Sequence, residues 1–201
     1  MKLMKNNTLL FLTGLSGSGK GYFKENILPK GLFYPLISMT TRNIRNGETD
    51  GIHYHFKSEY DFEKTNFVTY LDVNQEMRKP GDPKWLYGVS EQEFIAHKNQ
   101  NLIYDVIQPK YIRQMIDWCH KNKLTFDYKI LYFIQPLSGF EIASRRAGMK
   151  NDLDVRKQNT ANINDFHAVD LYPDWAIINS AQKMVFGADM IDYINALSIK
   201  K

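Results

Sequence analysis

Short apolar runs recur along the chain and alternate with stretches whose apolar positions have a helical spacing. The runs lie at residues 9–12, 33–37, 102–107, 129–134 and 175–178. The helical spacing indicates helices at residues 22–27, 90–97, 111–121 and 187–197. Strands that are apolar on both faces are typical of parallel sheets, which helices cover on each side. The alternation therefore predicts an α/β fold in which βαβ units surround a parallel sheet.

Two polar segments interrupt this alternation. Residues 38–86 are polar and aromatic and hold several turn signals, including Asn46-Gly47, where we expect a hairpin. Residues 138–157 form a second excursion that is rich in basic side chains. At 201 residues, we expect one compact domain with small insertions.

Composition excludes some classes of protein. With 43% hydrophobic and 24% charged residues, the chain has the values of an ordinary globular protein. Its net charge of +4 comes from scattered basic residues, so we expect no nucleic-acid partner. The run at 9–12 is too short for a membrane span or a secretory signal, which predicts a cytoplasmic protein without membrane association. We expect a monomer or a homodimer.

The single cysteine, Cys119, rules out an intramolecular disulfide and fits a reducing compartment. It lies within the amphipathic pattern of residues 111–119. This setting favours a buried apolar side chain over a nucleophile.

A glycine-rich turn separates the first apolar run from the first helical stretch. In a strand-turn-helix context, backbone N–H groups can surround a phosphate, and glycine permits both the close approach and positive φ. Lys20 would add a mobile positive charge for the β- and γ-phosphates. We therefore predict a nucleoside triphosphate site formed by Gly14, Ser16, Gly17, Ser18, Gly19, Lys20 and Gly21.

The metal contact of this site is predicted to be weak. Gly21 stands where a Ser or Thr would usually ligate Mg²⁺, so a water would replace the missing oxygen. Asp105 comes at the end of a buried strand and is the best candidate for a carboxylate acting on metal-bound water. A helix cap or a turn residue is an equally good interpretation of Asp105.

A second motif lies in residues 38–56. Arg42 and Arg45 are three residues apart, Ser38 stands at the end of a strand, and Tyr54 follows within a dozen residues. Guanidinium groups match phosphate oxygens with two parallel hydrogen bonds, so these side chains could together bind one phosphate monoester.

The glycine-rich turn and residues 38–56 together resemble the guanylate kinase family. The family pattern Ser-x-Thr-Thr-Arg-x-x-Arg-x-Gly-Glu-x-x-Gly-x-x-Tyr-x-Phe is present at every fixed position from Ser38 to Phe56. Further landmarks, Tyr87-Gly88, the strand before Pro136 and Asn179, extend the resemblance over nearly the whole chain. It implies a three-layer P-loop kinase sandwich with a central parallel sheet, a small mixed-β excursion that binds the monophosphate, and an arginine-bearing lid.

The resemblance also implies domains and roles. Residues 1–37 and 87–201 would form the core domain, with the lid at 138–157, and residues 38–86 the monophosphate-binding subdomain. The acceptor's phosphate would be held by Ser38, Arg42, Arg45, Tyr54 and Tyr87. The triphosphate and the transferring group would be held by Lys20, Asn179 and lid arginines, of which we favour Arg156 and keep Arg145 and Arg146 as alternatives. ATP and Mg²⁺ are the implied cofactors.

The chain departs from the family at the positions that contact the guanine base. Thr69 stands in place of a Glu, Val89 in place of a Ser, and Asp105 is one residue out of register with a second carboxylate. A neutral hydroxyl gains less from the N–H donors of guanine than a carboxylate does. We therefore expect an intact phosphate site and an altered base site, in which Thr69 and Asp105 remain candidate substrate contacts.

Residues 78–85 look like an insertion between Thr69 and Tyr87. A replacement carboxylate could come from Asp72, Glu76 or Asp82, or a stacking surface from Trp85, but we favour an exposed loop.

The expected activity is ATP-dependent phosphorylation of a nucleoside monophosphate, with GMP or dGMP as the family's acceptor and the base preference open to change. A ribose 1,5-bisphosphate phosphokinase is one alternative, supported by Gly21, Thr69 and Val89 but opposed by the intact motif of residues 42–56. An inactive module that binds a phosphorylated peptide or protein is the other, and the presence of Lys20 opposes it.

Overall fold

The computed structural model describes residues 6–14, 20–75, 78–106, 110–134 and 175–179. Most of the glycine-rich turn, the basic excursion at 138–157 and the helix predicted at 187–197 lie outside these ranges.

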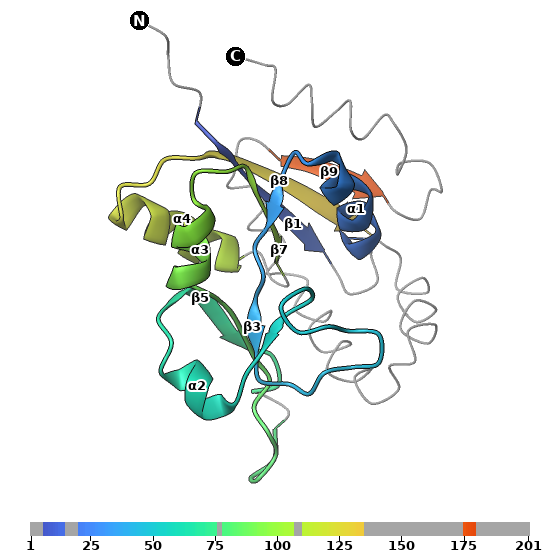
Figure 1. The fold of residues 1–201 in the computed structure, drawn as a ribbon, viewed down its shortest axis with the longest axis vertical. Helices are drawn as coiled ribbons and strands as arrows, with labels where there is room; N and C mark the ends of the chain where they lie inside the picture. Colours follow the sequence, from blue (N-terminus) through green and yellow to red (C-terminus); the bar gives the residue numbers. More distant parts are fainter. Residues whose placement is uncertain (1–5, 15–19, 76–77, 107–109, 135–174, 180–201) are drawn as a thin grey trace, which may run out of the picture.

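Five parallel strands form the larger sheet (Figure 1) in the spatial order β2-β7-β1-β8-β9. The strands are β1 (Thr8–Gly14), β2 (Tyr34–Pro35), β7 (Leu102–Val106), β8 (Asp127–Ile134) and β9 (Trp175–Asn179). Every adjacent pair is parallel. Each apolar run that predicts a strand forms one, so the predicted parallel sheet is confirmed.

Helices cover both faces of the larger sheet. They are α1 (Lys20–Ile27), followed by the short 3-10 helix η1 (Leu28–Lys30), on one face, and α3 (Glu91–His97) and α4 (Lys110–Lys121) on the other. Side chains alternate along a strand, so Leu10 and Leu12 of β1 pack toward α1 while Leu9 and Phe11 pack toward α3 and α4. This arrangement is the three-layer α/β sandwich that the sequence predicts.

Two details of the α3 and α4 layer follow from the sequence. α3 begins after Ser90, whose Oγ accepts a hydrogen bond from the amide of Glu93 at 3.1 Å and so caps the helix. Cys119 of α4 is fully buried, and burial raises the pKa of its thiol to about 11. The prediction that Cys119 is a buried apolar side chain is confirmed.

A smaller, mixed sheet lies beside the larger one (Figure 1) and has the strand order β4-β3-β6-β5. Its elements are β3 (Met39–Thr40), β4 (His55–Phe56), α2 (Glu59–Glu63), β5 (Phe67–Asp72) and β6 (Leu86–Ser90). β3 pairs with β4 in parallel, whereas β6 is antiparallel to both β3 and β5.

The connection between β3 and β4 differs from the predicted hairpin. A hairpin at Asn46-Gly47 would make the flanking strands antiparallel, but β3 and β4 are parallel, so this prediction is wrong. The chain instead makes two successive turns. In the first, the Glu48 amide donates to the Arg45 carbonyl at 3.0 Å, and in the second the Gly51 amide donates to the Tyr54 carbonyl at 2.8 Å.

The two faces of the smaller sheet have different neighbours. A Cβ at Gly88 of β6 would lie 2.7 Å from the Phe67 ring and 2.8 Å from the Cβ of Tyr70, so aromatic side chains cover the sheet there. Tyr87 and Val89 flank Gly88 and therefore point to the opposite face, which we call the inner face. Val89 is fully buried and belongs to the same apolar cluster as residues of α4, so the inner face packs toward the larger sheet's helical layer.

Among the helices that the structure describes, none has the length and apolar character needed to cross a bilayer.

Candidate active site

One group of predicted phosphate-binding residues lies at the end of β1. Gly14, its last residue, has a φ of +140°, and a Cβ there would lie 2.3 Å from the carbonyl oxygen of Phe133 on β8. Only glycine fits this position. Lys20, the first residue of α1, donates from Nζ to the Gly14 carbonyl at 2.8 Å. The ammonium group thus lies at the N-terminus of a helix. Its own charge and the positive end of the helix dipole both favour an anion there.

Asp105 lies beside Lys20 because β7 is the neighbour of β1. Its Oδ1 is 4.0 Å from the Lys20 Nζ, and its side chain is 34% exposed. Asp105 also acts on Tyr54 of the smaller sheet: burial raises the pKa of Tyr54, and the charges of Tyr87 and Asp105 raise it further. The Asp105 carboxylate therefore lies within electrostatic reach of both sheets' candidate residues.

Arg42 is the centre of the second group and is only 5% exposed. Its Nε donates to Tyr87 Oη at 2.8 Å, and its Nη1 donates to the carbonyl of Asn43 at 2.7 Å. Nη1 and Nη2 also donate to the two carboxylate oxygens of Glu48, at 2.7 and 2.5 Å. Within the described ranges, these bonds occupy four of the five guanidinium N–H groups, and the fifth is the second N–H of Nη2.

Two aromatic rings complete the surroundings of Arg42. Its Cζ lies 5.1 Å from the ring centre of Tyr54 and 5.5 Å from that of Phe56, both within cation–π range. Tyr54 in turn meets the Tyr87 ring edge to face at 5.6 Å. The structure therefore brings Arg42, Tyr54 and Tyr87 together; their binding of a phosphate stays a prediction.

Glu48 organises both arginines and is not among the site residues predicted from the sequence. Besides its bonds to Arg42, its Oε2 accepts a hydrogen bond from the Arg45 amide at 2.8 Å. Burial opposes ionisation of Glu48, but the hydrogen bonds from Arg42 and Arg45 outweigh it and lower its pKa. Its position in the sequence, three residues after Arg45, is the signal that could have identified it.

Ser38 lies where the two sheets meet. Its Oγ is 3.5 Å from the Oη of Tyr104, a long contact, and its carbonyl accepts from the His55 amide at 2.9 Å. Burial raises the pKa of Tyr104 to about 12. Ser38 therefore lies next to Tyr104, the residue that precedes Asp105 on β7.

Thr69 lies on β5, where it pairs with Val89 of β6 and shares the inner face. Thr69 is buried, and its Oγ1 donates to Oε1 of Gln114 on α4 at 2.9 Å. Gln114 is not predicted from the sequence, since nothing in the pattern joins two residues 45 positions apart.

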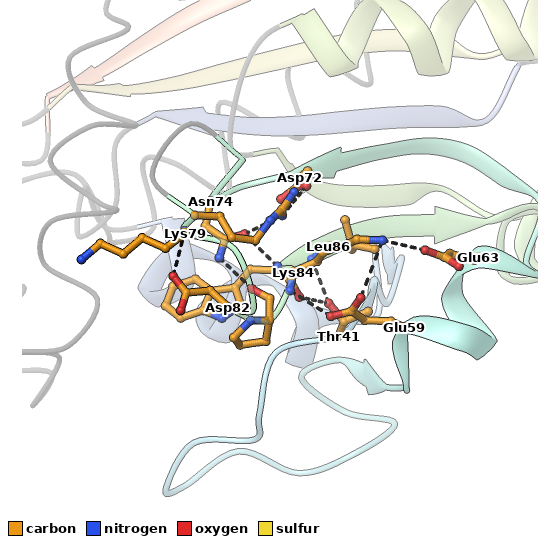
Figure 2. Close-up of polar contacts among 12 residues, drawn as sticks. Thr41, Glu59, Glu63, Asp72, Asn74, Lys79, Asp82, Lys84 and Leu86 are labelled. Carbon is orange, nitrogen blue, oxygen red and sulfur yellow. Dashed lines mark hydrogen bonds and ion pairs between the residues drawn. The ribbon is translucent and has the colours of Figure 1, made fainter.

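The loop between β5 and β6 is held by its own polar groups, which Figure 2 shows. Asp72 accepts from Arg78 Nη1 at 2.7 Å, and Asp82 accepts from the Lys79 amide at 2.9 Å. Along β5, Asp72 alternates with Leu71, so its side chain lies on the face opposite Thr69. Asp82 is exposed, as the loop interpretation predicts, whereas Asp72 ends β5 and its side chain is only 17% exposed, so the exposed-loop interpretation is wrong for Asp72.

The base of this loop is tied to the smaller sheet (Figure 2). The Thr41 Oγ1 donates to the Lys84 carbonyl at 2.5 Å and accepts from the Leu86 amide at 2.9 Å. The Lys84 ammonium donates to Glu63 of α2 at 2.7 Å. The Trp85 amide donates to Asn74 Oδ1 at 2.9 Å, which fixes the backbone of Trp85. Glu76 lies outside the described residues.

Several predicted site residues are not placed. Those outside the described ranges are Ser16, Gly17, Ser18, Gly19, Arg145, Arg146 and Arg156. Asn179 is described as the last residue of β9, paired with Ile134. Gly21 follows Lys20 in α1, and a Cβ there would meet no atom within 4 Å.

Comparisons with known proteins show the family of the chain. The family model described as guanylate kinase matches residues 6–165. The guanylate kinase of Caldanaerobacter subterraneus subsp. tengcongensis is 30% identical over 182 residues, which cover 89% of this chain and 82% of that protein. The guanylate kinase of Sulfurimonas denitrificans is 52% identical over 61 residues, and that of Vibrio parahaemolyticus 38% over 77 residues. These two matches span only 30% and 37% of their respective relatives.

A solved structure is similar in fold. The crystal structure of guanylate kinase from Anaplasma phagocytophilum superposes with a TM-score of 0.59, covering 99% of this chain and 89% of that one, at 16% sequence identity. At this identity the likeness concerns the fold alone.

Proposed function

Because the chain belongs to the guanylate kinase family, we propose that it transfers the γ-phosphoryl group of ATP to the phosphate of a nucleoside monophosphate. The observation that carries the proposal is the position of β7: Asp105 Oδ1 is 4.0 Å from the Lys20 Nζ, and the preceding residue, Tyr104, lies 3.5 Å from the Ser38 hydroxyl. Strand β7 thus adjoins both cationic groups, Lys20 at the start of α1 and the segment from Ser38 that carries Arg42. A transfer between two phosphates requires two such groups on either side of the reacting atoms.

The smaller sheet would hold the acceptor's phosphate. The hydroxyl groups of Tyr54 and Tyr87, the Arg45 guanidinium and the remaining N–H of Arg42 are donors suited to phosphate oxygens. The four internal hydrogen bonds of Arg42 would keep its guanidinium in one orientation before the ligand arrives. Glu48 would hold the backbone of Arg45 in the same way.

The reaction needs no general base, because a phosphate monoester is largely ionised at neutral pH. An oxygen of the acceptor phosphate would form a bond to the γ-phosphorus while the bond from that phosphorus to the bridging oxygen breaks. The products are a nucleoside diphosphate and ADP. Lys20 would neutralise charge on the β- and γ-phosphates, and the two anion-binding groups would align the reactants.

The residues present fit Mg²⁺ in part. Asp105 offers a partly exposed carboxylate beside Lys20, whereas Gly21 offers no oxygen. Asp105 would hold the ion directly or through water, and the bound ion would neutralise phosphate charge. Among the described residues, no cluster of three or more His, Cys, Asp or Glu side chains provides a dedicated metal site.

The test is an ADP-release assay over a panel of acceptors: GMP, dGMP, IMP, AMP, UMP, CMP and ribose 1,5-bisphosphate. We expect turnover of at least one nucleoside monophosphate, and a loss of about 10²–10³ in kcat for Lys20→Ala, by analogy with the loss of one donor to a developing charge. Lys24→Ala, one helical turn further along α1, is the matched control and should retain activity. Activity on ribose 1,5-bisphosphate alone would overturn the proposed acceptor, and ATP binding without any turnover would overturn the proposed reaction.

Gly21 gives a second test of the triphosphate site. Since a Cβ at this position would meet no atom within 4 Å, a serine fits without displacing a neighbour. We expect Gly21→Ser to lower the Mg²⁺ concentration needed for half-maximal rate, and Gly21→Ala, which adds no oxygen, to leave it unchanged. An equal response of both variants in a Mg²⁺ titration would argue against a metal contact at residue 21.

A further inference from the structure

We propose that the Gln114 amide, oriented by Thr69, contacts the base of the acceptor, and that the site therefore does not select guanine by its exocyclic amine. This inference rests on the proposed function. It concerns a residue on α4 that the sequence pattern does not single out.

The position of Gln114 follows from the geometry of the inner face. Tyr87, which bonds to Arg42, and Val89 are two residues apart on β6, so their side chains are about 7 Å apart along the same face. Thr69 is the cross-strand neighbour of Val89, about 5 Å from it. In a nucleoside monophosphate the ribose separates phosphate from base by a similar span. A monophosphate that lies along this face with its phosphate near Tyr87 would therefore have its base edge beside Thr69 and Gln114.

The Gln114 amide has a fixed orientation and hydrogen-bonding groups that a ligand could use. Gln114 is exposed, and within the part of the chain that the structure describes its hydrogen bond is the one from Thr69 to Oε1. Thr69 is 4% exposed and lies within a strand, so this bond fixes the amide's orientation from a rigid element. One lone pair of Oε1 and both N–H groups at Nε2 remain available to a partner.

Two carboxylates near Gln114 in the sequence and fold are already engaged. The nearby carboxylates have other partners: Glu91 accepts from Trp118 Nε1 at 2.8 Å, and Asp117 pairs with Arg113 at 3.0 Å. Val89 adds a fully buried apolar side chain. Among these residues the base side of the site thus presents the Gln114 amide, and Asp105, the remaining candidate carboxylate, lies 4.0 Å from the Lys20 ammonium.

An amide and a carboxylate recognise different base edges. A carboxylate accepts from two adjacent donors, such as the N1–H and the 2-amino group of guanine. An amide accepts once and donates once, which matches the N1–H and O6 of guanine and equally those of hypoxanthine. Within the 6-oxopurine monophosphates, the acceptor class expected for the family, the 2-amino group should therefore contribute nothing to selection.

The test compares GMP with IMP, which differ only in that amino group. For the wild-type chain we expect kcat/KM and the dissociation constant, measured by titration calorimetry, to agree within about threefold between the two. Gln114→Glu should raise the preference for GMP over IMP by about tenfold or more, because its carboxylate accepts from both donors of guanine. Gln114→Leu should weaken both acceptors by the same factor. Arg113→Gln, the preceding exposed residue on α4, is the control and should change neither value.

A wild-type preference for GMP above about tenfold would overturn the inference. A Gln114→Glu variant that is folded by circular dichroism, yet has the wild-type ratio, would do the same. Failure of the proposed function has a different signature, since no monophosphate would then be phosphorylated or bound by any of the variants.

Discussion

The two halves of the proposed acceptor site are built differently. On the phosphate side, Arg42 makes four hydrogen bonds inside the protein, two of them to the charged Glu48. On the base side, Thr69 and Gln114 share one neutral hydrogen bond. Hydrogen bonds to charged groups are about twice as strong as neutral ones, so the first half is fixed by several strong contacts and the second by one modest contact. Substitutions on the phosphate side should therefore cost much stability together with activity, while those on the base side should change acceptor binding at a small cost in stability.

The largest effect is expected from Arg42→Ala. This change removes a buried cation and the two hydrogen bonds that it donates to Glu48, so the free energy of unfolding should fall by about 3–5 kcal/mol. Chemical denaturation measures the change. Arg113→Ala is the matched control, because the Arg113–Asp117 pair is 65% and 57% exposed and should contribute less than about 1 kcal/mol. Equal losses in the two variants would show that burial of Arg42 does not matter.

An intermediate effect is expected from Glu48→Gln, which keeps the shape of the side chain and removes its charge. The loss should be about 1.5–3 kcal/mol at pH 7, the range for hydrogen bonds to a charged group. The pKa of Glu48 in the folded protein is lowered from its ordinary value of 4.5, so its contribution is complete above that pH and is lost as the pH falls through the lower folded value.

Denaturation at a series of pH values separates this effect from a general acid response. The wild-type chain should lose stability below about pH 4.5 more steeply than Glu48→Gln does, so the two curves should converge at low pH. Parallel curves between pH 3 and pH 7 would contradict a charged Glu48 in the Arg42 contact.

The smallest effect is expected from Thr69→Val, which replaces the hydroxyl that orients Gln114 with a methyl group of similar size. One neutral hydrogen bond is lost, so the free energy of unfolding should fall by about 0.5–1.5 kcal/mol. Activity on GMP and IMP should fall equally in steady-state assays. A loss as large as that of Arg42→Ala would remove the contrast between the two halves.

The larger sheet could be predicted from the sequence because its strands are buried on both faces. Runs such as residues 9–12 are apolar at every position, which few other settings require, and all five runs form strands. The cap of α3 at Ser90 could also be predicted from the sequence, because a serine followed three residues later by a glutamate, here Glu93, is a helix-start signal.

The smaller sheet was harder to predict because its strands are short and its turns are irregular. Asn46-Gly47 is a strong local hairpin signal, yet β3 and β4 pair in parallel and the connection makes two turns. The pairing of Thr69 with Gln114 depends on how α4 packs on β5, a tertiary contact that no local pattern encodes. The role of Glu48 could in principle have been predicted from the sequence, because Glu48 is a carboxylate three residues after Arg45 in an arginine-bearing motif.

Binding of a dinucleoside pentaphosphate, which carries an adenosine at one end and a guanosine at the other, tests most directly whether Lys20 and the Arg42 group serve one site. Titration calorimetry should show that Lys20→Ala and Arg45→Ala each weaken binding by about tenfold or more, a change of about 1.4 kcal/mol, while Arg113→Ala leaves it unchanged. If either Lys20→Ala or Arg45→Ala retained the wild-type dissociation constant, the two groups would not bind the same ligand, and the proposed transfer between them would be wrong.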